Sequence, residues 1–446
     1  MYDYQEEAIA AWKNNNYKGF YVMATGTGKT WTAIYSAKEL LKEHPALIVI
    51  AAPYKHLVKQ WAEDVEKVFK DAAIVLVSSE NQHWFSLAKQ AVLAQKYNEN
   101  KQVILITTIK SFYSEKFDYV LNMSHQEKIL IVDEAHRFTQ RPDELKETFN
   151  YLLGLSATPV NGKNNEAGEE LMKFFGGQVY SLPIEVALEN KFLVPYYYHP
   201  IYVSASEEEE DGFAALSSML AHCFNEQGIV IDKEKLFKYT RARLRIISMA
   251  EAKINGVDQL IAKVPIKDHL VVYCGDGKLF EENEEEIRHI QYVKKHIDKI
   301  GLKTSQFTAS EDMNRRMELV DMFNKKEIDT LVAIRCLDEG INIPSIKSAL
   351  ILSSNDDYRE FVQRRGRILR KYDGKKYADI FDVVVLPSTA TPKFAQIELR
   401  RFYEYARLAI NKEELLVELN KQLVYYGLTM EDVQFFGDEM EAELDD

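Results

Sequence analysis

The sequence predicts an α/β fold in which parallel strands alternate with helices, in two separate stretches of the chain. Short apolar runs rich in β-branched residues recur through residues 1–203, and segments long enough to form helices separate them. The alternation gives way to a helical pattern over residues 204–265 and resumes over residues 266–392. Such runs are typical of strands buried on both faces, with crossover helices on each side of the sheet. We therefore expect two tandem doubly wound parallel sheets, a helical connector between them, and a helical extension with an acidic tail at residues 393–446.

Ten apolar runs are the expected strands. In the first stretch they lie at residues 20–24, 46–52, 73–78, 103–108, 129–133 and 152–157. In the second stretch they lie at residues 269–274, 329–334, 348–354 and 377–386. Because helix-length segments separate the runs, we expect crossover connections that keep neighbouring strands parallel. In the connector, the expected helices include residues 213–224 and 242–254.

The composition excludes several classes of protein. Three cysteines in 446 residues cannot form a disulfide framework, and they fit a reducing, cytoplasmic location. No apolar run reaches the length of about 18 residues that a membrane span requires. The net charge of −13 comes largely from acidic runs at residues 207–211, 281–286 and 437–446. The rest of the chain is close to neutral, so the net charge does not exclude a nucleic acid as the partner.

A glycine-rich loop after the first expected strand predicts nucleotide binding. It reads Met23-Ala-Thr-Gly-Thr-Gly-Lys-Thr30 and is followed by a helical segment, although Met23 stands where the usual pattern has its first glycine. Glycines let backbone N–H groups turn toward phosphate oxygens, the lysine reaches the β- and γ-phosphates, and the last hydroxyl can bind Mg²⁺. We expect the following residues to hold ATP: Thr25, Gly26, Thr27, Gly28, Lys29 and Thr30.

Two acids end the apolar run at residues 129–133. In an open parallel sheet, ligands bind beyond the carboxyl ends of the strands. Asp133 is therefore expected to hold Mg²⁺ together with Thr30, and Glu134 to orient and deprotonate the attacking water. On its own the pair is equally consistent with a solvated turn, but a phosphate loop about 100 residues upstream favours the catalytic interpretation.

With these features the chain resembles the superfamily 2 helicases and translocases of the DEAH-box type. The resemblance rests on motifs that occur in the family's order: Tyr4-Gln5, residues 23–30, Pro53 to Trp61, Ile106-Thr-Thr108, Asp133-Glu-Ala-His136, Leu155-Ser-Ala-Thr-Pro159, residues 269–274, Thr308-Ala-Ser310, Asp338 to Pro344 and Gln363 to Arg370. Within the superfamily the chain looks closest to UvsW-like and XPB-like helicases and to the motors of restriction and phage-defence systems.

The resemblance implies two RecA-like domains, of which only the first carries a phosphate loop. It implies that Gln5 recognises adenine and that Gln363, Arg367 and Arg370 from the second domain complete the ATP site. Arg364 and Arg365 in the same run face either solvent or acids. The motif that contains Gly340 and Asn342 is expected to contact the ribose; the family usually has an aspartate where this chain has Asn342, and an amide brings no charge to that contact.

The resemblance also implies residues that couple ATP hydrolysis to movement on nucleic acid. His136, Ser156 and Thr158 are the expected coupling residues. The expected nucleic-acid contacts are Lys55, His56, Gln60, Thr107, Thr108 and Thr308, for each of which a surface or capping role is an equal alternative. We expect Trp61 in the core rather than stacked on a base.

Together the motifs predict an ATP-dependent nucleic-acid motor, with DNA favoured over RNA as its substrate. An RNA helicase is one alternative, and an ATP-switched scaffold in a defence complex is another. A nucleotide-binding protein without hydrolysis is disfavoured, because Lys29, Glu134 and Arg367 are all present. We expect the connector and the residues after 390 to direct the motor to its substrate, or a protein partner or an upstream domain to do so.

Overall fold

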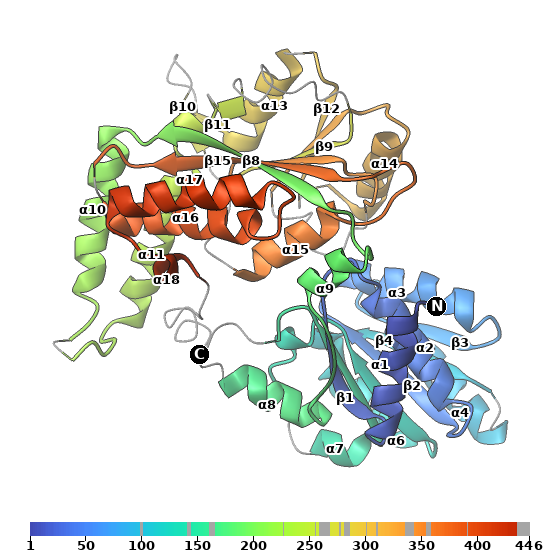
Figure 1. Cartoon of the computed structure of the whole chain (residues 1–446). Helices are drawn as coiled ribbons and strands as arrows, with labels where there is room; N and C mark the ends of the chain where they lie inside the picture. Colours follow the sequence, from blue (N-terminus) through green and yellow to red (C-terminus); the bar gives the residue numbers. More distant parts are fainter. Residues whose placement is uncertain are drawn as a thin grey trace. The chain divides into compact units, whose positions relative to one another are not determined.

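The chain forms two compact units, Met1–Ala187 and Leu188–Asp446, in a computed structural model. The structure describes residues 1–98, 101–140, 144–159, 166–225, 227–254, 256–257, 268–275, 278–280, 286–299, 301–308, 311–334, 343–353, 358–389 and 391–434. Each unit is built on its own parallel sheet (Figure 1). The expected architecture of two α/β sheet domains is therefore confirmed.

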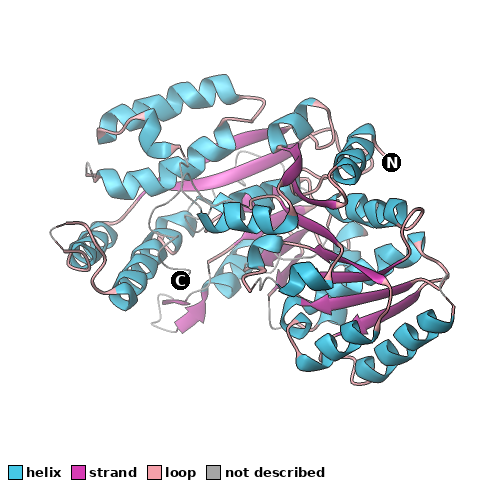
Figure 2. Ribbon diagram, turned by 90° about the horizontal axis from the view of Figure 1, so that it is seen from below, coloured by secondary structure: helices cyan, strands magenta, loops and turns pink. Residues whose placement is uncertain are grey.

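The first unit contains a seven-stranded parallel sheet in the order β3-β4-β2-β5-β6-β1-β7. Its strands are β1 (Lys18–Met23), β2 (Ala46–Ala52), β3 (Ala73–Val77), β4 (Val103–Thr108), β5 (Glu127–Val132), β6 (Tyr151–Ser156) and β7 (Gln178–Leu182). Its helices are α1 (Asp3–Asn14), α2 (Lys29–Leu40), α3 (Lys55–Val68), α4 (Trp84–Tyr97), α5 (Ile109–Phe112), α6 (Glu115–Met123), η1 (Ala135–Arg137), α7 (Glu144–Thr148), α8 (Glu166–Phe175) and α9 (Ile184–Glu189). Every residue of β2, β4 and β6 is buried, as expected for strands with helices on both faces (Figure 2).

The register of the first sheet brings the ends of three strands to one edge. Val22 of β1 lies level with Ser156 of β6, and Val132 of β5 lies level with Gly154 of the same strand. The phosphate loop and the Asp133–Glu134 pair therefore follow the two strands on either side of β6, at the carboxyl edge that parallel strands share.

The second unit contains a six-stranded parallel sheet in the order β12-β13-β9-β14-β15-β8 and a separate hairpin of β10 and β11. Its strands are β8 (Tyr196–Ser204), β9 (Leu270–Tyr273), β10 (Lys278–Phe280), β11 (Glu286–Arg288), β12 (Thr304–Phe307), β13 (Thr330–Ala333), β14 (Ser348–Ile351) and β15 (Ala378–Leu386). Its helices include α10 (Glu207–Ala221), α11 (Lys233–Ser248), α13 (His289–Lys299), α14 (Met313–Asn324), α15 (Tyr358–Ile368), α16 (Pro392–Ala406), α17 (Lys412–Tyr426) and α18 (Met430–Val433).

The boundary between the two units lies earlier in the chain than expected, because of strand β8. We expected the first domain to extend to residue 203, but β8 pairs with β15 along its whole length and belongs to the second sheet. The first unit accordingly ends at Ala187. Aromatic side chains and Pro200 interrupt the apolar character of this edge strand. It therefore does not form the continuous apolar run by which the other strands were expected.

The expected connector packs on the second unit rather than standing apart from it. Its helix α10 places Glu210 within hydrogen-bonding distance of the Ser388 and Thr389 hydroxyl groups. The Phe213 ring on the same helix stacks on Phe394, with ring centroids 4.8 Å apart. Residues 204–254 are therefore an elaboration of the second unit.

The expected extension at residues 393–446 is also part of the second unit, at least through helix α16. Arg401 of α16 donates hydrogen bonds to Asp382 of β15 and to Glu398 of its own helix, and all three side chains are buried. Glu404 of α16 pairs with Arg365 of α15 at 2.6 Å. Removal of the whole segment would thus leave buried charges of the second unit unpaired and destabilise that unit.

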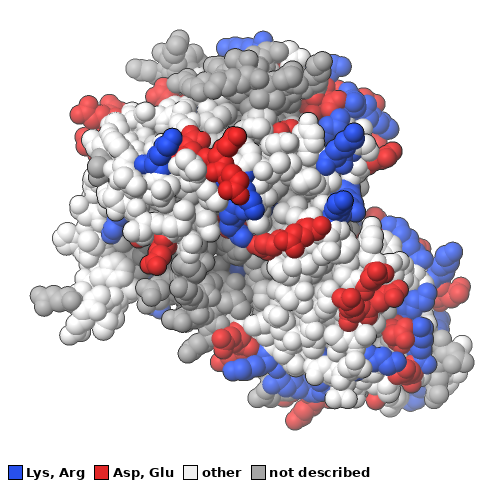
Figure 3. Space-filling model, in the orientation of Figure 1, with Lys and Arg blue, Asp and Glu red and all other residues white. Residues whose placement is uncertain are grey.

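The surface of the described residues is mixed in charge. On the face drawn in Figure 3, basic and acidic side chains are interspersed over the described part of both units. Among the described residues, no helix is both long and apolar enough to cross a membrane.

Candidate active site

The phosphate loop has the backbone conformation that its glycines predict. Gly26 and Gly28 have φ angles of 89° and 84°, in the left-handed region that favours glycine. Lys29 begins helix α2, and its Nζ atom donates a hydrogen bond to the carbonyl oxygen of Met23 at 3.0 Å. The Oγ1 atom of Thr25 is buried and makes no hydrogen bond. A buried polar atom of this kind beside a helix N-terminus fits a loop that receives phosphate oxygens.

Helix α1 supports the phosphate loop directly. The Tyr4 hydroxyl donates to the carbonyl oxygen of Thr27 at 2.5 Å, and the Gln5 amide donates to the Thr32 hydroxyl at 3.2 Å. A Cβ atom at Gly28 would lie 3.4 Å from the Gln5 amide nitrogen. Burial raises the pKa of Tyr4 to about 12, so its hydroxyl remains a donor. Gln5 thus lies at the loop; adenine recognition by Gln5 stays a prediction.

Asp133 lies just beyond the end of β5, with both carboxylate oxygens held. Its Oδ2 atom accepts a hydrogen bond from the indole nitrogen of Trp61 at 2.8 Å, and its Oδ1 atom accepts one from the backbone N–H of Glu134 at 3.0 Å. Burial and then the Glu134 charge raise the pKa of Asp133 to about 6, while the Trp61 hydrogen bond and the Lys29 charge act in the opposite direction. A desolvated carboxylate supplies the hard oxygen ligands that Mg²⁺ prefers, and its joint binding of the metal with the Thr30 hydroxyl stays a prediction.

Replacement of Asp133 by asparagine should remove ATP hydrolysis and make the stability of the nucleotide-free protein less dependent on pH, because the amide does not titrate, although it can accept only one of the two hydrogen bonds that the carboxylate accepts. Because folding raises the pKa of this carboxyl group, the folded state binds more protons than the unfolded state between about pH 4 and pH 6. Above that range the ionised carboxylate destabilises the fold by on the order of 3 kcal/mol. Calorimetry without Mg²⁺ or nucleotide should show that the Tm of the variant rises relative to the Tm of the wild type between pH 4 and pH 7 (roughly the two ends of this titration). A Tm difference between the variant and the wild type that stays constant from about pH 4 to about pH 7 would contradict this.

Glu134 and the coupling residues lie next to one another. Glu134 has a left-handed φ of 44° and begins the short helix η1. Its Oε2 atom lies 3.5 Å from His136 Nδ1, which is also 3.2 Å from the Ser156 hydroxyl. That hydroxyl accepts a hydrogen bond from the backbone N–H of Thr158 at 3.1 Å, and the Thr158 hydroxyl is buried without a hydrogen-bond partner. The structure therefore brings His136, Ser156 and Thr158 together, and their role in coupling stays a prediction.

The expected nucleic-acid contacts on helix α3 are only partly exposed. Lys55 is the first residue of the helix and is exposed, whereas His56 and Gln60 are half-buried. The His56 ring stacks on Tyr54, with centroids 5.5 Å apart. A contact with a phosphate backbone is therefore open to Lys55 at the surface, and it stays a prediction for all three residues.

The three expected threonine contacts are buried and engaged within the protein. The Thr107 hydroxyl donates to the backbone oxygen of Thr108, and the Thr108 hydroxyl caps helix α5 by accepting from the Ser111 N–H at 3.1 Å. In the second unit the Thr308 hydroxyl donates to Glu311 at 2.7 Å. The capping alternative thus describes Thr108, and binding of nucleic acid at these positions stays a prediction.

The motif from Gln363 to Arg370 (motif VI) contains four arginines, of which two are structural. Arg364 is buried, donates to the Ser353 carbonyl oxygen at 3.0 Å and pairs with Glu360 at 2.7 Å. Arg365 is fully buried and donates to the backbone oxygen and the carboxylate of Glu404. Both arginines therefore face acids rather than solvent.

The other two arginines, Arg367 and Arg370, are half-buried near the end of helix α15. Burial and the nearby Arg367 charge lower the pKa of Arg370 to about 9. Lys375 fixes this end of the helix, because its Nζ atom donates to the carbonyl oxygens of Ile368 and Arg370. Two adjacent guanidinium groups form a favourable environment for an anion. Gln363 is half-buried on the same helix, while Gly340 and Asn342 lie outside the described residues.

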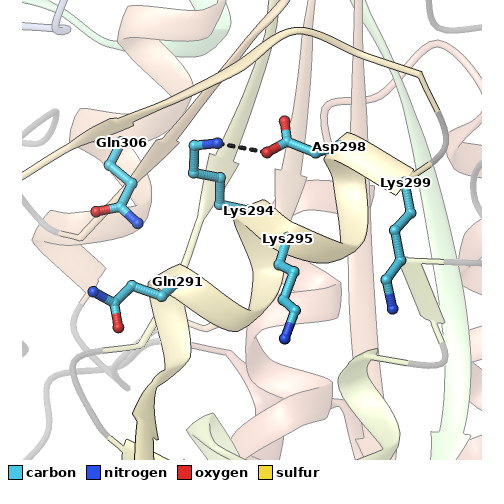
Figure 4. Close-up of a pocket in the computed structure, with 6 residues that line it drawn as sticks. All are labelled: Gln291, Lys294, Lys295, Asp298, Lys299 and Gln306. Carbon is cyan, nitrogen blue, oxygen red and sulfur yellow. Dashed lines mark hydrogen bonds and ion pairs between the residues drawn. The ribbon is translucent and has the colours of Figure 1, made fainter.

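A groove on the second unit stands apart from these residues. It lies on α13 and the edge strand β12, and Lys294 there pairs with Asp298 (Figure 4). The residues that line it are Gln291, Lys294, Lys295, Asp298, Lys299 and Gln306. Because no predicted site residue lines the groove, we do not assign it to ATP binding.

Sequence reasoning missed several supports of the site. Trp61 was expected in the core, where it lies, but its bond to Asp133 was not foreseen. Tyr4 and Lys375 were likewise not singled out for their contacts with the phosphate loop and the motif VI helix. The only sequence signal was that Tyr4 and Trp61 fall within motifs.

Two protein-family models match the chain and together cover more than half of it. The res subunit of type III restriction enzymes matches residues 1–161, and the helicase conserved C-terminal domain matches residues 253–372. The first match contains the phosphate loop and the Asp133–Glu134 pair, and the second contains the motif VI arginines.

Individual relatives and a solved structure agree with these matches. The DNA 3'-5' translocase XPB2 of Sulfurisphaera tokodaii is 25% identical over 86% of this chain and 81% of its own length. A protein of Methanocaldococcus jannaschii named as an ATP-dependent RNA helicase is 29% identical over 90% of this chain and 60% of its own length. The ATP-dependent Type ISP restriction-modification enzyme LlaBIII, solved bound to DNA, is 17% identical with a TM-score of 0.64, over 98% of this chain and 33% of that one. The two parallel sheets are thus tandem RecA-like domains, and the chain belongs to the superfamily 2 helicases and translocases.

Proposed function

We propose that this chain is a Mg²⁺-dependent ATPase motor that moves along DNA. The observation that carries the proposal is the meeting of the phosphate loop, Asp133–Glu134 and Ser156 at one edge of the first sheet. The relatives named for DNA translocation and DNA-bound restriction favour DNA as the substrate. The same proposal includes that the motor acts in the cytoplasm, either on nucleoid DNA or on phage DNA.

The chain's own residues divide the work of hydrolysis. The phosphate-loop N–H groups and Lys29 bind the triphosphate, and Glu134 orients the attacking water and takes its proton. Thr30 and Asp133 would hold Mg²⁺, which supplies charge stabilisation at the phosphates. Arg367 and Arg370 would stabilise the charge that grows on the transferring phosphoryl group, and Gln363 would assist from the same helix.

Coupling to movement would run through the residues that contact Glu134. His136 lies within reach of both Glu134 and Ser156. A change of charge at Glu134 during hydrolysis would therefore alter the hydrogen bonds of the segment at residues 156–158. We propose that this segment transmits the nucleotide state to the surface that holds nucleic acid.

Duplex DNA should stimulate ATP turnover more than single-stranded DNA or RNA of the same length. The expected result is an increase in kcat with duplex DNA at a saturating concentration, measured by phosphate release with the full chain. The salt dependence of the stimulation should be steep, because phosphate contacts release counterions. If only RNA stimulated turnover, the substrate of the motor would be RNA instead of DNA, as in the name of the M. jannaschii relative.

The scaffold alternative is tested by strand displacement. A translocating motor should displace a third strand from a DNA triplex as it hydrolyses ATP. An ATP-driven switch in a defence complex would show DNA-stimulated turnover without displacement, and its action would then depend on a protein partner.

A further inference from the structure

Trp61 makes an unusually direct contact with the metal-binding carboxylate. Its indole N–H donates to Asp133 Oδ2 at 2.8 Å, across 72 positions of sequence. The Trp61 and Asp133 side chains are 1% and 6% exposed, so water does not compete for the bond. With Oδ1 held by the Glu134 N–H, the plane of the carboxylate is fixed before any metal binds.

The same helix carries Trp61 and the expected nucleic-acid contacts. Helix α3 begins at Lys55 and buries Val58, Trp61 and Val65 against the sheet. These positions form one helical stripe. A displacement of the first turn, at whose start Lys55 is exposed, would therefore move Trp61 along with it, because the helix is a rigid hydrogen-bonded unit.

A second contact joins the start of α3 to the segment after Asp133. The Arg137 guanidinium of η1 lies over the Tyr54 ring, 5.1 Å from its centroid. Tyr54 is the residue that precedes α3, and its ring stacks on His56. The segment from Asp133 to Arg137 is thus joined to α3 in two places, at Asp133 through Trp61 and at Arg137 through Tyr54, the residue before the helix.

We propose that Trp61 is a positioning residue that orients Asp133 for Mg²⁺ and connects this carboxylate to the nucleic-acid contacts at the start of α3. Hydrogen bonds to metal-ligating groups orient them, and their loss typically lowers metal affinity or activity about 10- to 100-fold. The part of the proposal that concerns nucleic acid rests on the proposed function, whereas the part that concerns Asp133 does not.

Trp12 provides a matched control within the same unit. It is fully buried, and its indole N–H donates to the Leu152 carbonyl oxygen of β6 at 3.0 Å. Trp12→Phe and Trp61→Phe therefore remove the same buried donor and leave an oxygen acceptor behind. They differ in the acceptor, which is a metal-binding carboxylate only for Trp61.

The first measurement uses Mn²⁺ and ADP, without turnover or nucleic acid. Electron paramagnetic resonance of free Mn²⁺ should show that Trp61→Phe weakens Mn²⁺ binding to the ADP complex about tenfold. Trp12→Phe should leave it within about twofold of the wild type. Equal losses in the two variants, or no loss in Trp61→Phe, would overturn the positioning role.

The second measurement compares ATP turnover with and without saturating duplex DNA at saturating Mg²⁺. Trp61→Phe should reduce the stimulation ratio several-fold while the Kd for DNA stays unchanged, and Trp12→Phe should keep the wild-type ratio. A wild-type ratio in Trp61→Phe would overturn the connection to α3. Absence of stimulation by any nucleic acid in the wild type would instead refute the proposed function, and the Mn²⁺ result would still decide the role at Asp133.

A third variant covers the case in which Trp61→Phe does not fold. Incorporation of benzothienylalanine at position 61 replaces the N–H by sulfur and keeps the bicyclic shape. The same tenfold loss of Mn²⁺ affinity is expected from it, with a Tm close to the wild type. Unchanged Mn²⁺ affinity in this variant would reject the hydrogen bond as the cause.

Discussion

Replacement of Glu134 by glutamine should abolish ATP turnover and leave nucleotide binding intact. Glutamine has the shape of glutamate and can still accept a hydrogen bond, but it cannot take a proton from water. Loss of a general base typically lowers kcat by about 10²–10⁴-fold. Phosphate release measures the loss, and the Kd of a fluorescent ATP analogue measures the retained binding.

Glu127→Gln is the matched control for this prediction. Glu127 begins the same strand, β5, at the end away from the site, and its carboxylate accepts a hydrogen bond from the Tyr151 hydroxyl at 2.5 Å. The same chemical change there should leave kcat within about threefold of the wild type, as for a substitution remote from the site. Turnover that survives in Glu134→Gln would assign the base to another group and remove the catalytic interpretation of the Asp133–Glu134 pair.

The ten expected strands are all present, because each is a continuous apolar run; nine of them lie in the interior of a parallel sheet, and β3 is an edge strand that keeps its apolar run. The parallel strands that escaped prediction are β7, β8 and β12, which lie at the edges of their sheets, and the hairpin strands β10 and β11 escaped it as well. An edge strand pairs on one side only and tolerates polar residues, as in the Thr-Ser-Gln-Phe sequence of β12. Its sequence therefore lacks the signal that identifies a central strand.

In the site, too, features formed by consecutive residues could be predicted, whereas contacts between residues distant in sequence could not. The phosphate loop and the Asp133–Glu134 pair are predictable because the chemistry lies within a few consecutive residues at a strand end. The bonds from Trp61 to Asp133 and from Arg365 to Glu404 join residues 72 and 39 positions apart. No periodicity or spacing in one sequence specifies such pairs. For the same reason, the run of four arginines did not reveal which two are structural.

Replacement of Arg367 by alanine should remove most of the ATP turnover without unfolding the second unit. An arginine that stabilises the transferring phosphoryl group contributes about 10³–10⁵ in rate. Arg367 is half-buried and follows the two structural arginines on α15. Lysine at this position should restore little of the turnover, because an ammonium group cannot make the paired hydrogen bonds of a guanidinium group. Phosphate release at saturating ATP and DNA measures the loss.

Arg365→Met separates this catalytic effect from a structural one. Arg365 is fully buried against Glu404, so its loss leaves a buried carboxylate with Arg407 as the remaining ion-pair partner among the described residues. Loss of one partner of a buried pair typically costs about 3–5 kcal/mol, which urea denaturation would detect as a lower midpoint. The two variants should therefore show opposite signatures: Arg367→Ala loses turnover at nearly wild-type stability, whereas Arg365→Met loses stability first. If Arg367→Ala lost stability and the folded fraction kept its turnover, Arg367 would be a structural residue, and the motor mechanism would need a different source of positive charge at the phosphates.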